Sequence, residues 1–110
     1  MPPSAEGSVF ASLSDPMRRR LVRDLAQQSP RTATQLAEGY PISRQGVLKH
    51  LHVLRDAGLV TTRKHGREAR YSLATDPLVQ ASRWIREITT LWDQRLLRLK
   101  AFVEEDDSGG

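Results

Sequence analysis

The chain has 110 residues, of which 38% are hydrophobic and 27% charged, and this balance excludes both a membrane-embedded protein and a wholly disordered one. Its length suits one domain of modest size. Cysteine is absent, which excludes a disulfide framework, a thiolate nucleophile and a cysteine-ligated metal centre. The N-terminus shows no basic segment followed by an apolar stretch, so we expect no signal peptide and a cytoplasmic setting.

The net charge of +4 is distributed unevenly along the chain. Residues 16–73 include twelve basic and four acidic side chains, a net charge of +8. The rest includes five basic and nine acidic side chains, a net charge of −4. A basic body with an acidic tail predicts a polyanionic partner, and it favours nucleic acid over a membrane surface.

The sequence predicts a disordered tail at each end of the chain. Residues 1–7 and 104–110 contain almost no apolar side chains to bury, so we expect them to be disordered. The remaining residues, 8–103, show no internal repeat and no second domain. We therefore predict one folded domain over that range.

Four helices are predicted in the first half of the chain. An apolar patch at residues 9–13 predicts a brief first helix. The pair at 15–16 (Asp-Pro) starts the second, because aspartate caps free N–H groups and proline needs none at the first helical position. Residues 32–35 (Thr-Ala-Thr-Gln) resemble a capping box and start a short third helix. A fourth helix, capped by Ser43, follows over residues 43–57 after a tight turn at 39–41. The third and fourth helices together form a helix-turn-helix layout.

The second half changes pattern. The β-prone runs 59–65 and 68–73 flank Gly66-Arg67, which predicts a hairpin with a basic tip. Residues 77–103 predict a long helix whose apolar side chains recur at intervals of three and four. The fold class is therefore mainly α with a small β-hairpin (α+β): a winged helix-turn-helix with about five helices and a two-stranded wing.

The helix at 43–57 has two distinct faces. With Val47 taken as inward, Leu51 and Leu54 lie within about 40° of it, and polar side chains take the opposite side. Arginine can bind guanine and glutamine can pair with adenine in the major groove, while the helix N-terminus suits a phosphate. An ordinary solvated face is the alternative interpretation of this helix alone. The candidates for contact with DNA here are Ser43, Arg44, Gln45, Lys49 and His52.

The hairpin strengthens the nucleic-acid interpretation. A basic ribbon next to such a helix can contact the DNA backbone or the minor groove. A merely solvated turn would explain polarity, but it explains poorly why almost every charge has one sign. The candidate wing residues are Arg63, Lys64, His65, Arg67 and Arg70.

Three segments together resemble the ArsR/SmtB family of winged-helix repressors. They are residues 10–21, 43–60 and 66–73, and the resemblance extends over about residues 8–103. It implies a homodimer that reads a two-fold operator on double-stranded DNA through paired recognition helices. The base-facing positions of the family map to Arg44, Gln45, Leu48 and Lys49. Leu48 departs from the family pattern, in which a small polar residue is usual, and it can at most touch a thymine methyl group.

Metal sensing, the best-known chemistry of that family, is not expected here. Thr32, Thr34 and Gln35 stand where one common site has cysteines, and residues 77–103 lack the histidines of the other. His50 and His52 diverge by about 200° around their helix and cannot chelate one ion. We therefore expect no metal and no cofactor, and we leave a small-molecule inducer unidentified.

The last helix is expected to serve both its own domain and a partner. Its two tryptophans lie eight residues apart near one face, and self-complementary contacts of this kind build two-fold dimers. The residues predicted to form the dimer contact are Val9, Phe10, Leu13, Trp84, Ile88, Leu91, Trp92, Leu96 and Leu99.

No catalytic motif is visible, so the chain is not expected to be an enzyme. The prediction is a homodimeric DNA-binding regulator, a repressor on an inverted-repeat operator, with no membrane partner. Two alternatives remain open: a sequence-indifferent DNA-coating protein, and a protein-interaction module that uses the tryptophan-bearing helix. These alternatives differ in DNA affinity and in discrimination among sequences.

Overall fold

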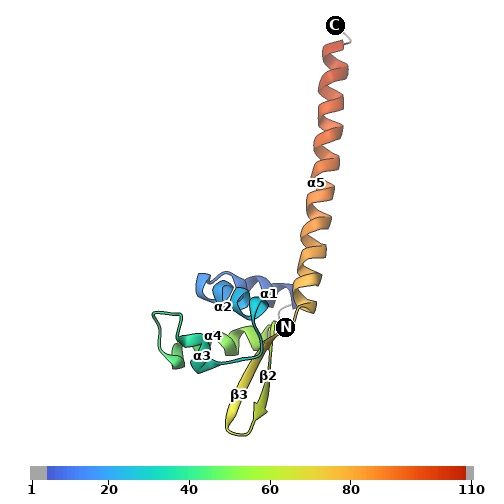
Figure 1. Cartoon of the computed structure of the whole chain (residues 1–110). Helices are drawn as coiled ribbons and strands as arrows, with labels where there is room; N and C mark the ends of the chain where they lie inside the picture. The colour runs from blue at the N-terminus through green and yellow to red at the C-terminus, as the bar shows by residue number, and fades with distance from the viewer. Residues whose placement is uncertain (1–4, 109–110) are drawn as a thin grey trace.

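Two parts of different shape make up the chain: a small winged body and a single helix that projects from it (Figure 1). The computed structural model describes residues 5–108, and side chains over residues 7–105. Its principal dimensions are 77 × 31 × 24 Å. In chain order the elements are α1 (Ala5–Leu13), α2 (Pro16–Gln27), β1 (Arg31–Thr32), α3 (Ala33–Ala37), α4 (Arg44–Asp56), β2 (Val60–His65), β3 (Glu68–Leu73) and α5 (Asp76–Ser108).

The helices α2, α3 and α4 start at side chains that cap them, as predicted. The Asp15 carboxylate accepts the N–H groups of two residues in the first turn of α2. Thr32 and Gln35 form a reciprocal capping box at α3, with N···O distances of 3.1 and 2.9 Å. The Ser43 hydroxyl accepts the Gly46 N–H at 3.1 Å. These local bonds satisfy N–H groups that a helix leaves unpaired, and so they fix where each helix begins.

The core is a cluster of leucine and valine side chains that the helices and the hairpin share. Val47, Leu51 and Leu54 of α4 are completely buried, which confirms the inward face predicted from helical spacing. Burial of one such side chain contributes about 1.5–3 kcal/mol, so this row fixes the rotation of α4 about its axis. The other fully buried apolar side chains are Val9, Leu21, Leu25, Leu36, Leu59 and Val60.

The wing is a three-stranded antiparallel sheet in the order β1-β3-β2, rather than the two-stranded hairpin expected. Strands β2 and β3 pair from Val60↔Leu73 to His65↔Glu68, around a turn where Gly66 has a φ of +62°. The short strand β1 adds the pairs Arg31↔Tyr71 and Thr32↔Arg70. A two-residue strand carries no alternation for the sequence to reveal, and it exists because β3 offers its free edge.

Both terminal helices extend beyond the predicted domain limits. Helix α1 already begins at Ala5, and α5 continues to Ser108, so residues 5–7 and 104–108 are helical rather than disordered. At the C-terminal end, Lys100 and Glu104 lie one helical turn apart with a 3.9 Å contact between Nζ and Oε1. Such pairs favour continuation of the helix into the acidic segment. The other predicted tail positions, 1–4 and 109–110, lie outside the described residues.

Candidate nucleic-acid interface

The face of α4 opposite the core is open to solvent. Arg44, Gln45, Lys49 and His52 are all exposed on it, as the sequence predicts. The buried row on the other side holds the helix in one rotation, so these four side chains are presented together. Their donors cover the chemistry needed for base edges and for phosphates.

Leu48 lies at the boundary between this face and the core. It is half-buried and packs against the core edge. It also lines an open hollow of about 330 Å³ between α3, the start of α4 and the wing. The polar residues around this hollow are Thr32, Thr34, Gln35, Arg44, Arg67 and Glu68. Thr34, exposed on α3, also lines this hollow, although the sequence analysis does not name it as a DNA contact. Its position at the start of the first helix of the helix-turn-helix is the feature of the sequence that could have indicated it.

The turn that precedes α4 is tied to α2. The buried Tyr40 hydroxyl donates a hydrogen bond to the Asp24 carboxylate, and the Arg20 guanidinium lies 4.6 Å from the centre of the Tyr40 ring. Burial, followed by the hydrogen bond to Asp24, raises the pKa of Tyr40 well above its ordinary value. The turn therefore has a fixed position, and with it the capped start of α4 at Ser43.

The wing distributes its cations over two faces. Arg63 pairs directly with Arg70 across the strands, and His65 pairs with Glu68. Because side chains alternate along a strand, Arg63, His65 and Arg70 share one face and line a hollow there. Arg67 in the turn instead lines the hollow shared with α4. The predicted wing set is thus brought together only in part, and Arg67 is the member that lines a hollow together with the recognition helix.

Charge compensation also differs between these residues. Arg70 contacts the Glu68 carboxylate at 3.6 Å and is half-buried. Within residues 7–105, Arg44, Lys49 and Arg67 form no ion pair, and neither do the wing-strand residues Arg63 and Lys64. An exposed cation without a carboxylate partner is available to neutralise a phosphate.

A separate apolar surface runs along α5. Phe10 of α1 packs edge-on against Trp84, with 5.5 Å between ring centres, at the base of the helix. Farther along α5, large apolar side chains have little or no cover within the chain. Between 44% and 54% of each side chain is exposed for Trp84, Ile88, Leu91, Trp92, Leu96 and Leu99.

Two of the predicted dimer residues belong to the body rather than to this surface. Val9 is 1% exposed, because it packs into the chain's own core, so the prediction that it contacts a partner is withdrawn. Leu13 is half-buried and packs against the same core. Phe10 remains partly open beside Trp84.

The described part of the chain contains no cluster of three or more potential metal-ligating side chains. Over residues 5–108, no helix combines the length and the apolar character needed to cross a membrane. The features that the structure does present are a capped helix with an exposed basic face, a wing beside it and a core that fixes both. Together they define a winged helix-turn-helix DNA-binding protein.

Comparison with known proteins narrows this class. A family model described as a helix-turn-helix domain matches residues 13–63. The transcriptional repressor SdpR of Bacillus subtilis is 32% identical over 89 residues, which cover 81% of this chain and 98% of that protein. A probable mercury resistance operon repressor of Streptomyces lividans is 35% identical over 77 residues, 70% of this chain and 60% of that protein.

The fold has close counterparts among solved structures. An ArsR-like transcriptional regulator from Rhodococcus sp. RHA1 superimposes with a TM-score of 0.79 at 37% identity, and the match covers 90% of this chain and 92% of that one. The chain belongs to the ArsR/SmtB family of winged helix-turn-helix transcriptional regulators. Members of this family regulate transcription and are not enzymes, so the chain is a DNA-binding regulator without catalytic activity.

Proposed function

We propose that the protein is a homodimeric, sequence-specific repressor that binds an inverted-repeat operator in the cytoplasm. Helix α4 enters the major groove, where Arg44, Gln45, Lys49 and His52 contact base edges. The observation that carries this proposal is the exposed face of α4. Its cations have no acidic partner within residues 7–105, and the hollow beside it also includes Arg67 of the wing. A helix face that is merely solvated would not need a wing cation beside it.

The wing and the first turn of α4 hold the DNA backbone in this proposal. Arg67 lines the same hollow as Arg44, so it can bind a phosphate beside the base that Arg44 contacts. Ser43 uses its oxygen to cap α4, and its hydroxyl hydrogen stays available for a phosphate oxygen. The strand residues Arg63, Lys64, His65 and Arg70 contact the backbone or the minor groove farther out.

Dimerisation through α1 and α5 is supported by the apolar surface that α5 exposes. A contiguous row of half-exposed tryptophan, leucine and isoleucine side chains is unusual for a monomer and typical of an interface. A two-fold contact uses the same surface on both copies, so it presents two α4 helices to the two halves of an inverted repeat. Phe10, Trp84, Ile88, Leu91, Trp92, Leu96 and Leu99 are the proposed contact residues.

Regulation in this proposal does not use a metal bound by cysteine, since the chain has no cysteine. Release from the operator then requires a signal that favours the DNA-free conformation over the DNA-bound one, and an inducer would do so by binding the DNA-free conformation more tightly. Occupancy of the operator by the dimer excludes the polymerase, which makes repression the expected outcome.

Fluorescence anisotropy at about 0.15 M salt tests the DNA-binding part of this proposal. The probe is the duplex upstream of the protein's own gene, or one selected from random sequences, and a scrambled duplex competes with it. A preference of roughly a thousandfold supports specific regulation. Equal, salt-sensitive binding to both duplexes would instead indicate a DNA-coating protein, and absence of binding would favour a protein-interaction module.

Substitutions then locate the surface. Arg44→Ala and Gln45→Ala should each lose about 1–3 kcal/mol of operator binding and relax the preference at the matching base. Arg67→Ala should weaken all duplexes evenly and reduce the salt dependence. Arg86→Ala, on the side of α5 away from the apolar row, removes the same charge and should change neither. Equal losses from Arg44→Ala and Arg86→Ala would contradict the assignment of α4.

A further inference from the structure

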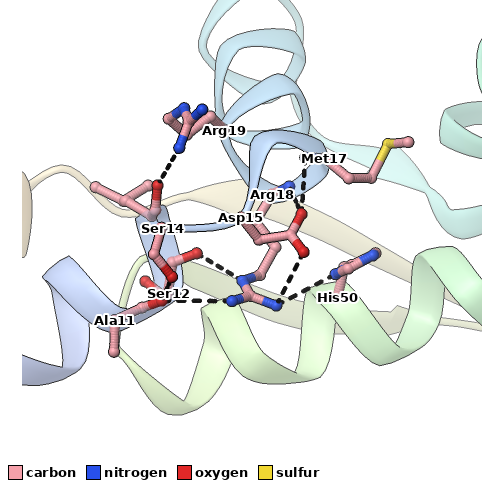
Figure 2. A network of polar contacts seen from close by, with 9 residues as sticks. Ala11, Ser12, Ser14, Asp15, Met17, Arg18, Arg19 and His50 are labelled. Atoms are coloured by element: carbon pink, nitrogen blue, oxygen red, sulfur yellow. Dashed lines mark hydrogen bonds and ion pairs between the residues drawn. The ribbon is translucent and has the colours of Figure 1, made fainter.

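Arg18, near the start of α2, joins three parts of the body. Figure 2 shows its guanidinium group at the centre of a network of polar contacts. Its Nε donates to the Ser12 carbonyl oxygen at 2.5 Å, and one terminal nitrogen donates to the Ala11 carbonyl oxygen at 3.3 Å. The other terminal nitrogen lies 3.4 Å from Nδ1 of His50, on the recognition helix. The side chain is only 17% exposed, so these contacts are largely shielded from water.

The two carbonyl groups belong to the last turn of α1. Carbonyl groups there have no partner within the helix and form the negative end of its dipole, so a cation that binds them stabilises the end of α1. The same helix carries Phe10, which packs on Trp84 at the base of α5. Arg18 therefore connects the helix next to the proposed dimer contact with the helix proposed to read DNA.

The contact with His50 requires one protonation state. Arginine can only donate hydrogen bonds, so Nδ1 of His50 must act as the acceptor. That is true of the neutral ring with its hydrogen on Nε2, and a protonated ring has no acceptor. Protonation would place a second cation 3.4 Å from the guanidinium group.

Asp15 is the acidic group that acts on both side chains. This carboxylate, the cap of α2, lies 3.9 Å from Arg18 and also interacts electrostatically with His50, so it offsets part of the repulsion between Arg18 and a protonated His50. The N–H groups at the start of α2, that of Arg18 first, lower the pKa of Asp15, so this carboxylate remains charged. On α4 itself, Asp56 lines the hollow next to Arg18, and Lys49 is exposed. The described side chains of α1, from Gly7 to Leu13, include no ionisable group.

We propose that Arg18 is a positioning residue for the recognition helix, that it acts through neutral His50, and that protonation of His50 releases α4 from α1 and weakens operator binding. This rests on the proposed function, because it concerns the affinity of α4 for its operator. Histidine is the side chain that changes charge near neutral pH, so acidification is the condition that breaks the contact.

Operator affinity measured against pH tests this proposal, at constant ionic strength and between pH 7.5 and pH 5.5. His50→Gln keeps a hydrogen-bond acceptor for Arg18 but removes the ionisable ring. We expect its affinity at pH 7.5 to stay within about twofold of wild type. Its loss of affinity on acidification should be smaller than that of wild type by about threefold to tenfold, the effect of one long hydrogen bond.

His52→Gln is the matched control, because His52 is exposed two residues away on the proposed DNA face. A protonated His52 attracts phosphates, so this substitution should remove a gain in affinity at low pH, the opposite sign from His50→Gln. When Arg18→Gln is already present, adding His50→Gln should no longer change the dependence of operator affinity on pH. If Arg18→Gln fails to fold, Arg18→Lys takes its place in this comparison.

Two further results would contradict the proposal. If wild type discriminates the operator but His50→Gln follows the same pH profile, the positioning role is wrong while the proposed function stands. If wild type shows no preference for any duplex, the proposed function fails and this role fails with it. Nitrogen-15 spectra of the imidazole rings give an independent measurement: Nδ1 of His50 should lack hydrogen at neutral pH, and Arg18→Gln should change the Nδ1 chemical shift of His50 but not that of His52.

Discussion

Helices α4 and α5 carry the same kind of apolar spacing and place it in opposite environments. On α4, Leu51 and Leu54 are completely buried, whereas on α5 Ile88, Trp92 and Leu99 are 44%, 54% and 50% exposed. Figure 1 shows why: α4 lies between other elements of the body, and most of α5 extends beyond them. Apolar periodicity therefore predicts a helix with a face to bury, but it does not say whether the cover comes from the same chain.

The largest effect is expected inside the body. Leu51→Ala should lower the free energy of unfolding by about 2–5 kcal/mol, because it removes a fully buried side chain and leaves a cavity. Val53→Ala, on the same helix but 41% exposed, should change it by no more than about 0.5 kcal/mol. Denaturant titration at one protein concentration measures both variants. Equal effects would mean that the buried row of α4 is not the core.

On α5 the corresponding change should act on assembly rather than on folding of the body. Ile88→Lys should raise the dimer dissociation constant at least about a hundredfold, since it buries an unpaired charge in the proposed contact. Leu97→Lys introduces the same charge on the other side of α5, where the side chain is 67% exposed, and should leave the dimer intact. Sedimentation equilibrium distinguishes the two variants. Dissociation of the dimer by Leu97→Lys but not by Ile88→Lys would mean that the contact lies on the opposite face of α5.

A smaller loss is expected at the turn before α4. Tyr40→Phe removes the hydrogen bond to Asp24 and should lower the free energy of unfolding by about 0.5–1.5 kcal/mol at neutral pH. Because the pKa of Tyr40 is raised on folding, its contribution is complete below about pH 10 and is lost as the pH rises further. The phenylalanine variant should lack that alkaline loss. Unfolding curves at pH 8 and pH 11 measure it, and parallel losses in both proteins would argue against the bond.

The smallest expected effect concerns the cap of α2. Asp15→Ala removes the acceptor for two N–H groups and should lower the melting temperature slightly at pH 7. The pKa of Asp15 is lowered on folding, so its contribution is present above the ordinary carboxyl range and disappears as the pH falls below it. The two melting temperatures should therefore converge below about pH 4. Asp93→Ala, on an exposed part of α5, is the control for removal of one carboxylate and should lower the melting temperature at pH 7 less than Asp15→Ala does.

Features that depend on residues close together in the sequence could be predicted, and features that depend on distant residues could not. Caps and helix faces depend on residues three or four positions apart, so Asp15, Ser43 and the buried row of α4 were predictable. The pairing of Arg63 with Arg70 depends on hairpin register, and β1 depends on an edge supplied about forty residues later. The contact between Arg18 and His50 spans 32 positions and has no local signature. The sequence does not place Val9 in the chain's own core, because an apolar residue near one end of a chain can pack against its own domain or against a partner.

The opposed pair Arg63 and Arg70 gives the free protein an unusual response to electrolytes. Like charges facing each other across two strands destabilise a hairpin, and the Glu68 carboxylate offsets only part of that repulsion. Mobile anions can screen what remains, so added salt should make the isolated wing more rigid. The same salt competes for the phosphates of DNA and loosens the complex. Ionic strength therefore acts in opposite directions on the free wing and on the complex with DNA.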